Sequence, residues 1–283
     1  MDDYLVKQAQ RIVDTALAED AVTSDITSDL TINDKLDGSG SFVIKDLGVL
    51  AGIEVARMVF AHVDPSLTFR TQVKDGTKIA NGDIVATISG RLKSILAGER
   101  LALNFLQRLS GIAAQTALYV NEVTGTKAQI YDTRKTTPGL RDLEKYAVTM
   151  GGGVNHRRDL SDGILIKDNH LAGAATTGLT LTDVVMRAKA GASDLLVEVE
   201  VESVDQARQA IAAGADILLL DNMSTSDMHT VVEMARGNVV LEASGGVTLD
   251  RVRDIAETGV DRISVGALTH SVRSLDISLD ITV

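Results

Sequence analysis

The chain has 283 residues, with 39 acidic residues against 28 Lys and Arg and a formal net charge of −11. Hydrophobic residues make up 45 % of the chain, which is enough for a sizeable core and excludes wholesale disorder. Only 3 % of the residues are aromatic, so few side chains could stack on bases, and the acidic excess would repel phosphate backbones. We therefore expect no nucleic-acid partner.

The chain contains no Cys, which excludes disulfides, Cys-ligated zinc, iron–sulfur clusters and a thiol nucleophile. No run of about 18 apolar residues occurs, so we expect no membrane span and no membrane partner. The acidic start, Met1-Asp2-Asp3-Tyr4, lacks the apolar core of a signal peptide. These features predict a cytoplasmic protein.

The first part of the chain mixes helices with short strands. Apolar residues at helical spacing predict helices over residues 3–19, 53–63 and 97–123. Short β-rich runs, separated by turns such as Asp75-Gly76 and Asn81-Gly82, predict strands at 41–44, 49–50, 67–73 and 84–88. This region is therefore predicted to be a separate α/β domain.

A regular βα repeat follows. Apolar runs predict strands at 128–131, 164–166, 195–201, 217–220, 239–241 and 263–265. Helical patterns alternate with the later runs, at 181–190, 203–213, 225–236 and 248–258. Such units imply parallel strands with right-handed crossovers, and strands buried on both faces favour an α/β barrel. Six strands are two short of eight, so the barrel is predicted to be incomplete.

We place the first domain at residues 1–112 and the barrel at 113–270. The tail, residues 271–283, has a β-like pattern and is predicted to return to the first domain. No Pro- or Ser-rich linker marks the boundary.

The later strands end in polar or glycine positions: Glu200, Asp221, Ser244 and Gly266. In an α/β barrel the site lies at the carboxyl ends of the strands, and phosphate often binds after the last two. Gly245 and Gly266 would let backbone N–H groups approach phosphate oxygens there. The alternative is that these glycines only allow tight strand-to-helix turns.

Alternating carboxylates share one face of a predicted strand: Glu198, Glu200 and Glu202. Carboxylates on a buried face need cationic partners, and Lys167 and Arg134 are the candidates. Glu200 and Asp221 could hold ribose hydroxyls or Mg²⁺, directly or through water. Glu198 fits a structural ion pair equally well, and Glu202 fits an exposed strand end.

Cationic side chains are concentrated in one segment. Residues 132–170 carry a net charge of +1, whereas the rest of the chain carries −12. Arg134-Lys135 follows a strand, His156-Arg157 follows three glycines, and Lys167 ends a strand. This segment suggests a small anionic ligand. Lys167 could bind phosphate or form a Schiff base. By contrast, Lys145 and Arg158 are interpreted as solvated charges, and no spacing matches a zinc motif.

Long stretches of the sequence resemble the quinolinate phosphoribosyltransferase family. The central block is DTRKTTPGLRDLEKYAV (132–148) followed by GGGVNHRRDLSDGILIKDNH (151–170). The likeness extends to GERLALNFLQRLSGIA (98–113), EVEVES (198–203), LLLDN (218–222), EASGGV (242–247) and GVDRISVGALTHS (259–271). One departure is Ala21-Val22-Thr23-Ser24, where many members have glycines.

The resemblance implies an N-terminal α/β sandwich domain, an incomplete α/β barrel and at least a homodimer. It implies that quinolinate contacts Arg134, His156, Arg157 and Lys167, with Lys135 nearby, while Arg100 reaches into the partner's site. Glu200 and Asp221 would lie by the ribose and Mg²⁺. Ser244, Gly245 and Gly266 would bind the 5-phosphate, with support from His270. The catalytic set would be Lys135, Lys167, Glu200 and Asp221.

The implied reaction converts quinolinate and phosphoribosyl pyrophosphate to nicotinate mononucleotide, pyrophosphate and CO₂, in NAD biosynthesis. Three alternatives stay open at this point. One is a molybdenum-locus relative of the same fold, although such relatives tend to depart from the Asp-Thr-Arg-Lys and Ile-Lys-Asp-Asn-His stretches kept here. Another is a Schiff-base aldolase using Lys167. The third is a non-catalytic sensor of pyridine carboxylates.

Overall fold

The computed structural model describes residues 1–192 and 194–283, which divide into two compact units. The first unit comprises residues 1–117, 136–152 and 267–283, and the second comprises 118–135 and 153–266. The first unit thus includes the segment that follows the Arg134-Lys135 pair as well as the C-terminal tail.

A four-stranded antiparallel sheet forms the frame of the first unit, in the order β12-β1-β5-β3. Its strands are β1 (Asp37–Ile44), β3 (Thr68–Thr71), β5 (Ile84–Arg91) and β12 (Ile277–Thr282). The last strand pairs with β1 from Ser39 opposite Thr282 to Ile44 opposite Ile277. Two short strands, β2 (Gly48–Val49) and β4 (Lys78–Ile79), form a separate ladder.

Helices complete the first unit: α1 (Asp3–Glu19), α2 (Ile26–Thr31), α3 (Ile53–Val63), α5 (Arg141–Met150) and α11 (Ala267–His270). The long helix α4 (Leu92–Glu122) begins here. Asp2 starts α1, since its carboxylate accepts the Leu5 N–H at 2.8 Å. The rings of Phe42, Phe60 and Phe69 pack together in the core, with centroids 5.7–6.0 Å apart.

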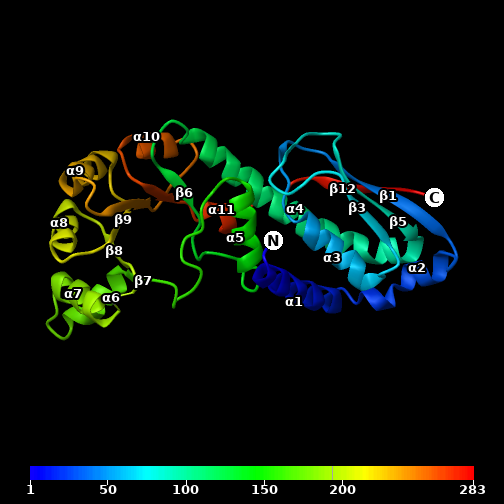
Figure 1. The fold of residues 1–283 in the computed structure, drawn as a ribbon, viewed down its shortest axis with the longest axis horizontal. Helices are drawn as coiled ribbons and strands as arrows, with labels where there is room; N and C mark the ends of the chain where they lie inside the picture. Colours follow the sequence, from blue (N-terminus) through cyan, green and yellow to red (C-terminus); the bar gives the residue numbers. More distant parts are fainter. Residues whose placement is uncertain (193) are drawn as a thin grey trace. The chain divides into compact units, whose positions relative to one another are not determined.

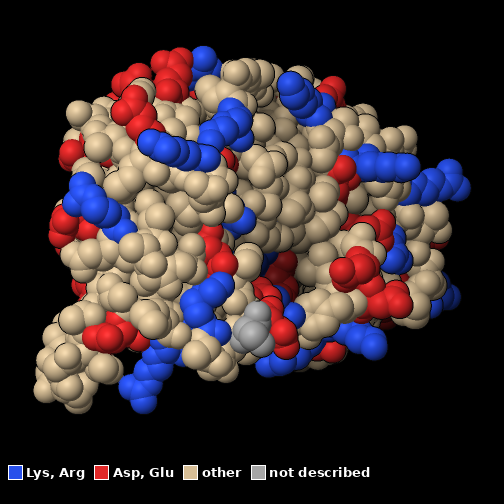
Figure 2. Space-filling view, turned by 60° about the vertical axis from the view of Figure 1, so that its left-hand side comes forward, with Lys and Arg blue, Asp and Glu red and all other residues tan. Residues whose placement is uncertain are grey.

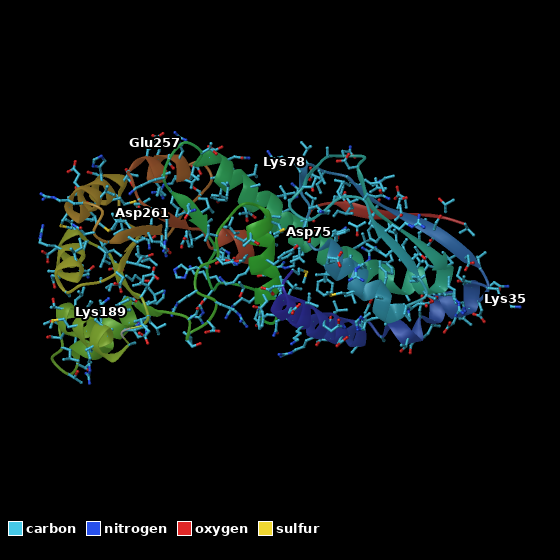
Figure 3. The ribbon with its side chains drawn as sticks, in the orientation of Figure 1. Lys35, Asp75, Lys78, Lys189, Glu257 and Asp261 are labelled. Carbon is cyan, nitrogen blue, oxygen red and sulfur yellow. The ribbon has the colours of Figure 1, made fainter. Side chains whose placement is uncertain are left out.

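A buried polar contact joins α5 to the start of α3. Asp75 accepts the backbone N–H groups of Gly52 and Ile53, at 2.9 and 3.1 Å, and the Tyr146 hydroxyl at 2.7 Å (Asp75 is labelled in Figure 3). Burial raises the pKa of Asp75, against the effect of these hydrogen bonds. The same carboxylate therefore caps one helix and holds the hydroxyl of another.

The second unit contains a six-stranded parallel sheet in the order β6-β11-β10-β9-β8-β7. Its strands are β6 (Gln129–Tyr131), β7 (Ile164–Ile166), β8 (Val197–Val201), β9 (Ile217–Asp221), β10 (Val240–Ser244) and β11 (Arg262–Ser264). Helices α7, α8 and α9 lie along the outer side of β8 and β9 (Figure 1). The edge strands are β6 and β7, so the sheet remains open.

Helices connect these strands: α6 (Asp168–Ala175), α7 (Leu181–Gly191), α8 (Val204–Ala212), α9 (Thr225–Ala235) and α10 (Val252–Glu257). The predicted fold class is confirmed: an α/β chain with an antiparallel-sheet region followed by an open parallel α/β unit. The six predicted strands and their parallel order are also confirmed.

Several local features differ from the sequence-based expectations. Helix α6 was not predicted from the sequence; at its start the His170 ring accepts the Lys167 N–H at 2.9 Å. Ala21 takes a left-handed conformation, φ 48°, which L side chains rarely adopt. Lys145 is buried rather than solvated, because α5 buries Leu143, Glu144 and Ala147 with it.

Acidic and basic side chains intermingle over the face shown in Figure 2. Within the described ranges, 1–192 and 194–283, no helix has both the length and the apolar character needed to cross a membrane.

Candidate anion-binding site

The carboxyl ends of the parallel strands bring the predicted site residues to one edge of the second unit. Lys167 directly follows β7, Glu200 lies near the end of β8, and Asp221 and Ser244 end β9 and β10. Gly266 comes two residues after β11. Asp221 lies opposite Ser244 in the sheet register. Parallel pairing thus gathers residues that are far apart in the chain.

Lys167 and Glu200 form an ion pair. The Lys167 Nζ donates to Glu200 Oε2 at 3.1 Å, and the two side chains are 47 % and 11 % exposed. The lysine therefore has a fixed cationic head at the strand ends. Schiff-base lysines usually lie in apolar pockets or beside another cation, so this carboxylate neighbour favours an anion-binding lysine.

The turn after β10 requires glycine at position 245. Gly245 has φ 87°, and a Cβ atom there would lie 2.3 Å from Asn222 Oδ1. Asn222 itself is left-handed, donates its N–H to the Ser244 carbonyl at 2.9 Å, and donates from Nδ2 to Asp221 Oδ2 at 2.8 Å. Backbone from β9 and β10 is therefore packed closely at the edge where phosphate was predicted.

Two arginines lie close together because their segments run side by side. Tyr131 and Val154 form a parallel β-bridge, in which Val154 makes backbone hydrogen bonds to Ile130 and Asp132. The Arg134 Nε is buried and has no hydrogen-bond partner among the residues that the structure describes. Burial, and then the charge of Arg134, lowers the pKa of Arg157. Two neighbouring cations, one with a buried donor that has no partner among the described residues, are suited to binding an anion.

His156 lies on a buried pair of carboxylates. Its Nε2 is 3.2 Å from Glu198 Oε2 and 3.2 Å from Glu242 Oε1. Burial by itself lowers the pKa of His156, whereas the hydrogen bonds to the two carboxylates raise it above its ordinary value. Glu198 is therefore paired with His156 and not with the predicted partners Lys167 and Arg134.

A cavity of about 260 Å³ opens beside His156 and Arg157. Tyr131 and Arg262 also line it, and the Arg262 guanidinium lies over the Tyr131 ring at 4.9 Å from its centroid.

Glu242 was missed by the sequence reasoning. It is fully buried and accepts a short hydrogen bond from the Ser264 hydroxyl. The available signal was its position two residues before Ser244, which places both side chains on the same face of β10.

Two predicted residues lie in more exposed places. Lys135 is exposed and its N–H donates to the Thr133 hydroxyl at 3.1 Å. Arg100 is exposed on α4, in the first unit. Its predicted role in a partner's site stays a prediction.

An open parallel α/β unit with cations and carboxylates at its strand ends defines an enzyme-like site for a small anionic ligand. Comparison with known proteins narrows this class. The quinolinate phosphoribosyl transferase N-terminal domain matches residues 25–110 and the C-terminal domain matches residues 112–280. The chain belongs to the quinolinate phosphoribosyl transferase family.

Curated relatives and solved structures agree with this assignment. A probable nicotinate-nucleotide pyrophosphorylase (carboxylating) of Bacillus subtilis is 40 % identical, covering 97 % of this chain and 94 % of its own. The Mycobacterium leprae nicotinate-nucleotide pyrophosphorylase is 42 % identical, covering 91 % of both. A Francisella tularensis nicotinate-nucleotide pyrophosphorylase structure has a TM-score of 0.91 at 39 % identity, covering 98 % of this chain and 96 % of its own.

Proposed function

We propose that this chain is a quinolinate phosphoribosyltransferase that converts quinolinate and phosphoribosyl pyrophosphate to nicotinate mononucleotide, pyrophosphate and CO₂. The observation that carries the proposal is the buried Arg134 Nε, which lies near Arg157 and has no hydrogen-bond partner in the described part of the chain. A ligand with two carboxylates would supply the missing acceptors and neutralise both guanidinium groups. Family membership over nearly the whole chain supports the same reaction.

The remaining site residues fit the second substrate. Glu200 and Asp221 project from the same face of neighbouring strands, since Glu200 lies opposite Leu219, two residues before Asp221. Their carboxylate oxygens are the donors that Mg²⁺ prefers, so the pair fits a magnesium site, direct or through water. Ser244, Gly245 and Gly266 would offer hydroxyl and N–H donors to the 5-phosphate.

The chemistry then needs charge placement rather than a general base. The pyridine nitrogen uses its own lone pair to form a bond to the ribose C1 as the bond from C1 to pyrophosphate breaks. Glu200 and Asp221 would stabilise the positive charge that develops on the ribose. Bound Mg²⁺ would offset the charge on the departing pyrophosphate.

Decarboxylation follows from the charge on the product of that step. The ring nitrogen is now cationic, so the ring can accept the electron pair released as the bond between C2 and the carboxylate breaks. A proton then takes the place of CO₂ at C2. The cations near this carboxylate, Lys135, Lys167 and the arginines, would have to bind it without forming ion pairs so tight that they oppose the loss of CO₂.

The proposal includes the oligomeric state and the cellular location. Arg100 is proposed to complete the site of a partner in a homodimer or larger homo-oligomer. Its exposure on α4 leaves the guanidinium available for that role. Phosphoribosyl pyrophosphate is multiply charged and does not cross membranes unaided, which supports a place in the cytoplasm.

The reaction can be tested directly. Purified protein incubated with quinolinate, phosphoribosyl pyrophosphate and Mg²⁺ should release nicotinate mononucleotide, pyrophosphate and CO₂ in equal amounts. Folded protein that forms none of the three would refute the function. Quinolinate binding without turnover would favour the sensor, and a covalent adduct trapped on Lys167 by borohydride would favour the aldolase. The molybdenum-locus alternative predicts no quinolinate turnover.

A further inference from the structure

A buried cluster of three side chains lies next to the paired arginines. We call His156, Glu198 and Glu242 the carboxylate–histidine cluster. The two glutamates are 4 % and 0 % exposed, and each keeps one oxygen, Glu198 Oε1 and Glu242 Oε2, without a hydrogen-bond partner among the described residues. Burying an ionised carboxylate is unfavourable unless a positive charge or hydrogen-bond donors compensate for the lost hydration.

The geometry of the cluster favours a hydrogen on His156 Nε2, between the two carboxylates, over a metal ion. Its three ligand atoms lie within 4.8 Å of one another, a spacing that a metal ion could also use. The His156 Nδ1, however, accepts the Arg157 N–H at 2.8 Å, so in the neutral ring the hydrogen is on Nε2, the atom that faces both carboxylates. The Arg262 guanidinium lies 3.8 Å from Glu242 Oε2 and adds a compensating positive charge. A cation on Nε2 would displace that hydrogen and add charge beside Arg262.

His156 is hydrogen-bonded to both arginine segments, through its backbone on one side and its ring on the other. The backbone N–H of His156 donates to Asp132 Oδ1 at 2.8 Å, and Asp132 is a fully buried residue two positions before Arg134. On the other side, the ring accepts the Arg157 N–H, and the Arg157 guanidinium donates to the Gly163 carbonyl at 2.9 Å. Whatever fixes the imidazole therefore fixes the backbone from which Arg157 projects.

We propose that Glu198 and Glu242 are positioning residues that clamp His156 and thereby hold Arg157 beside Arg134, so that the site selects a ligand with two carboxylates. This inference rests on the proposed function for the identity of the ligand. The two glutamates act only through His156 and do not themselves contact the ligand. Without the clamp, the like-charged arginines would move apart and recognition of two carboxylates would weaken.

The test compares Glu242→Gln and Glu198→Gln with Glu202→Gln, a control at an exposed glutamate that directly follows β8, the strand of Glu198. Calorimetry would measure the Kd of quinolinate, with two carboxylates, and of nicotinate, with one. We expect both clamp variants to bind quinolinate at least about 10-fold more weakly, which is about 1.4 kcal/mol, while nicotinate binding and the KM for phosphoribosyl pyrophosphate change by less than about twofold. The control should match the wild type.

A second readout does not depend on turnover. Nitrogen NMR of the five histidines, with His156→Gln for assignment, would follow the His156 ring through a pH titration. In the wild type, Nε2 should keep its hydrogen through neutral pH, and each clamp variant should lower the pH at which the ring titrates. Circular dichroism would confirm that the variants are folded. If only one of the two clamp variants folds, that variant is enough for the test.

The outcomes separate the two claims. Unchanged quinolinate affinity in a folded clamp variant would overturn this inference, as would an equal loss for quinolinate, nicotinate and phosphoribosyl pyrophosphate, which indicates a merely structural role. Wild-type protein that binds quinolinate but does not turn it over would contradict the proposed function alone, and the binding comparison would still decide the role of the glutamates.

Discussion

Arg134 and Arg157 illustrate how a fold can hold like charges together. Each guanidinium is partly buried, and the charge of Arg134 is among the causes that lower the pKa of Arg157. Three carboxylates raise the pKa of Arg157 and so partly offset the repulsion between the arginines: Glu198, Asp159 and Asp162. What is still missing is an acceptor for the buried Arg134 Nε. A bound carboxylate would provide it, which links the packing of one side chain to ligand recognition.

Replacing Arg134 tests this residue-scale argument. Arg134→Ala should lower kcat/KM for quinolinate by an amount corresponding to about 2–4 kcal/mol of transition-state binding, because a desolvated charge pair is lost. Steady-state kinetics with saturating phosphoribosyl pyrophosphate would measure the change. Arg208→Ala, which removes an exposed arginine paired with Asp205 on α8, should leave kcat/KM unchanged. Near-wild-type kinetics for Arg134→Ala would mean that the residue does not face the substrate.

At the scale of elements, the contact between α5 and α3 depends on one carboxylate. Asp75 accepts three hydrogen bonds, two from the start of α3 and one from Tyr146 on α5. Its burial raises its pKa above the ordinary value, whereas the Tyr146 hydroxyl works to lower it. A raised carboxyl pKa means that folding is favoured when Asp75 is protonated, and that this contribution is lost as the pH rises through the titration of the folded state.

Tyr146→Phe tests how the ionisation of Asp75 is linked to the free energy of unfolding. We expect a loss of about 1–2 kcal/mol in the free energy of unfolding at neutral pH, because the half-buried Asp75 carboxyl loses a hydrogen-bond donor. The variant raises the pKa of Asp75 further, so its deficit should shrink as the pH falls through the Asp75 titration. Urea unfolding at several pH values would measure this, with Tyr4→Phe as the control for an exposed tyrosine. A deficit that does not vary with pH would contradict the assignment.

Across the whole molecule, the charge of −11 is unevenly distributed. Residues 132–170 hold a net +1, and they include Arg134, Arg157 and Lys167 of the proposed site. The remaining −12 belongs to the rest of the chain, where acidic and basic side chains mix on the surface. This local concentration of positive charge is the sequence feature that supports the proposed binding of small anions at Arg134, Arg157 and Lys167.

The proposed assembly makes a prediction at this scale. If Arg100 completes the partner's site, then Arg100→Ala and Arg134→Ala should each be inactive alone and should regain activity when the subunits are mixed. A mixed dimer holds one intact site, and random exchange makes about half of the dimers mixed, so about a quarter of wild-type activity is expected. Mixing Arg134→Ala with Arg157→Ala should restore nothing, because both residues belong to the same subunit's site. Failure of the first mixture to regain activity would rule out the shared site.

Much of the architecture could be predicted from local pattern. Apolar runs and helical spacing located α1, α3 and the six parallel strands, because burial on one or both faces imposes its period directly on the chain. Helix α6 was not predicted, because its cap is a His170 ring nitrogen, which no standard capping pattern indicates. The positions of Glu200, Asp221 and Ser244 at or near strand ends were predicted correctly, because apolar runs mark where buried strands stop.

The sequence by itself thus determined the fold class, the strand ends and the segment that concentrates positive charge, since each is a property of neighbouring residues. Only the tertiary structure decided that His156 lies on Glu198 and Glu242, that Tyr131 and Val154 bring the two arginines together, and that Arg134 Nε is left without an acceptor. Those facts depend on contacts between residues that are 23 to 86 positions apart in the chain, and burial then sets the free energy of each contact.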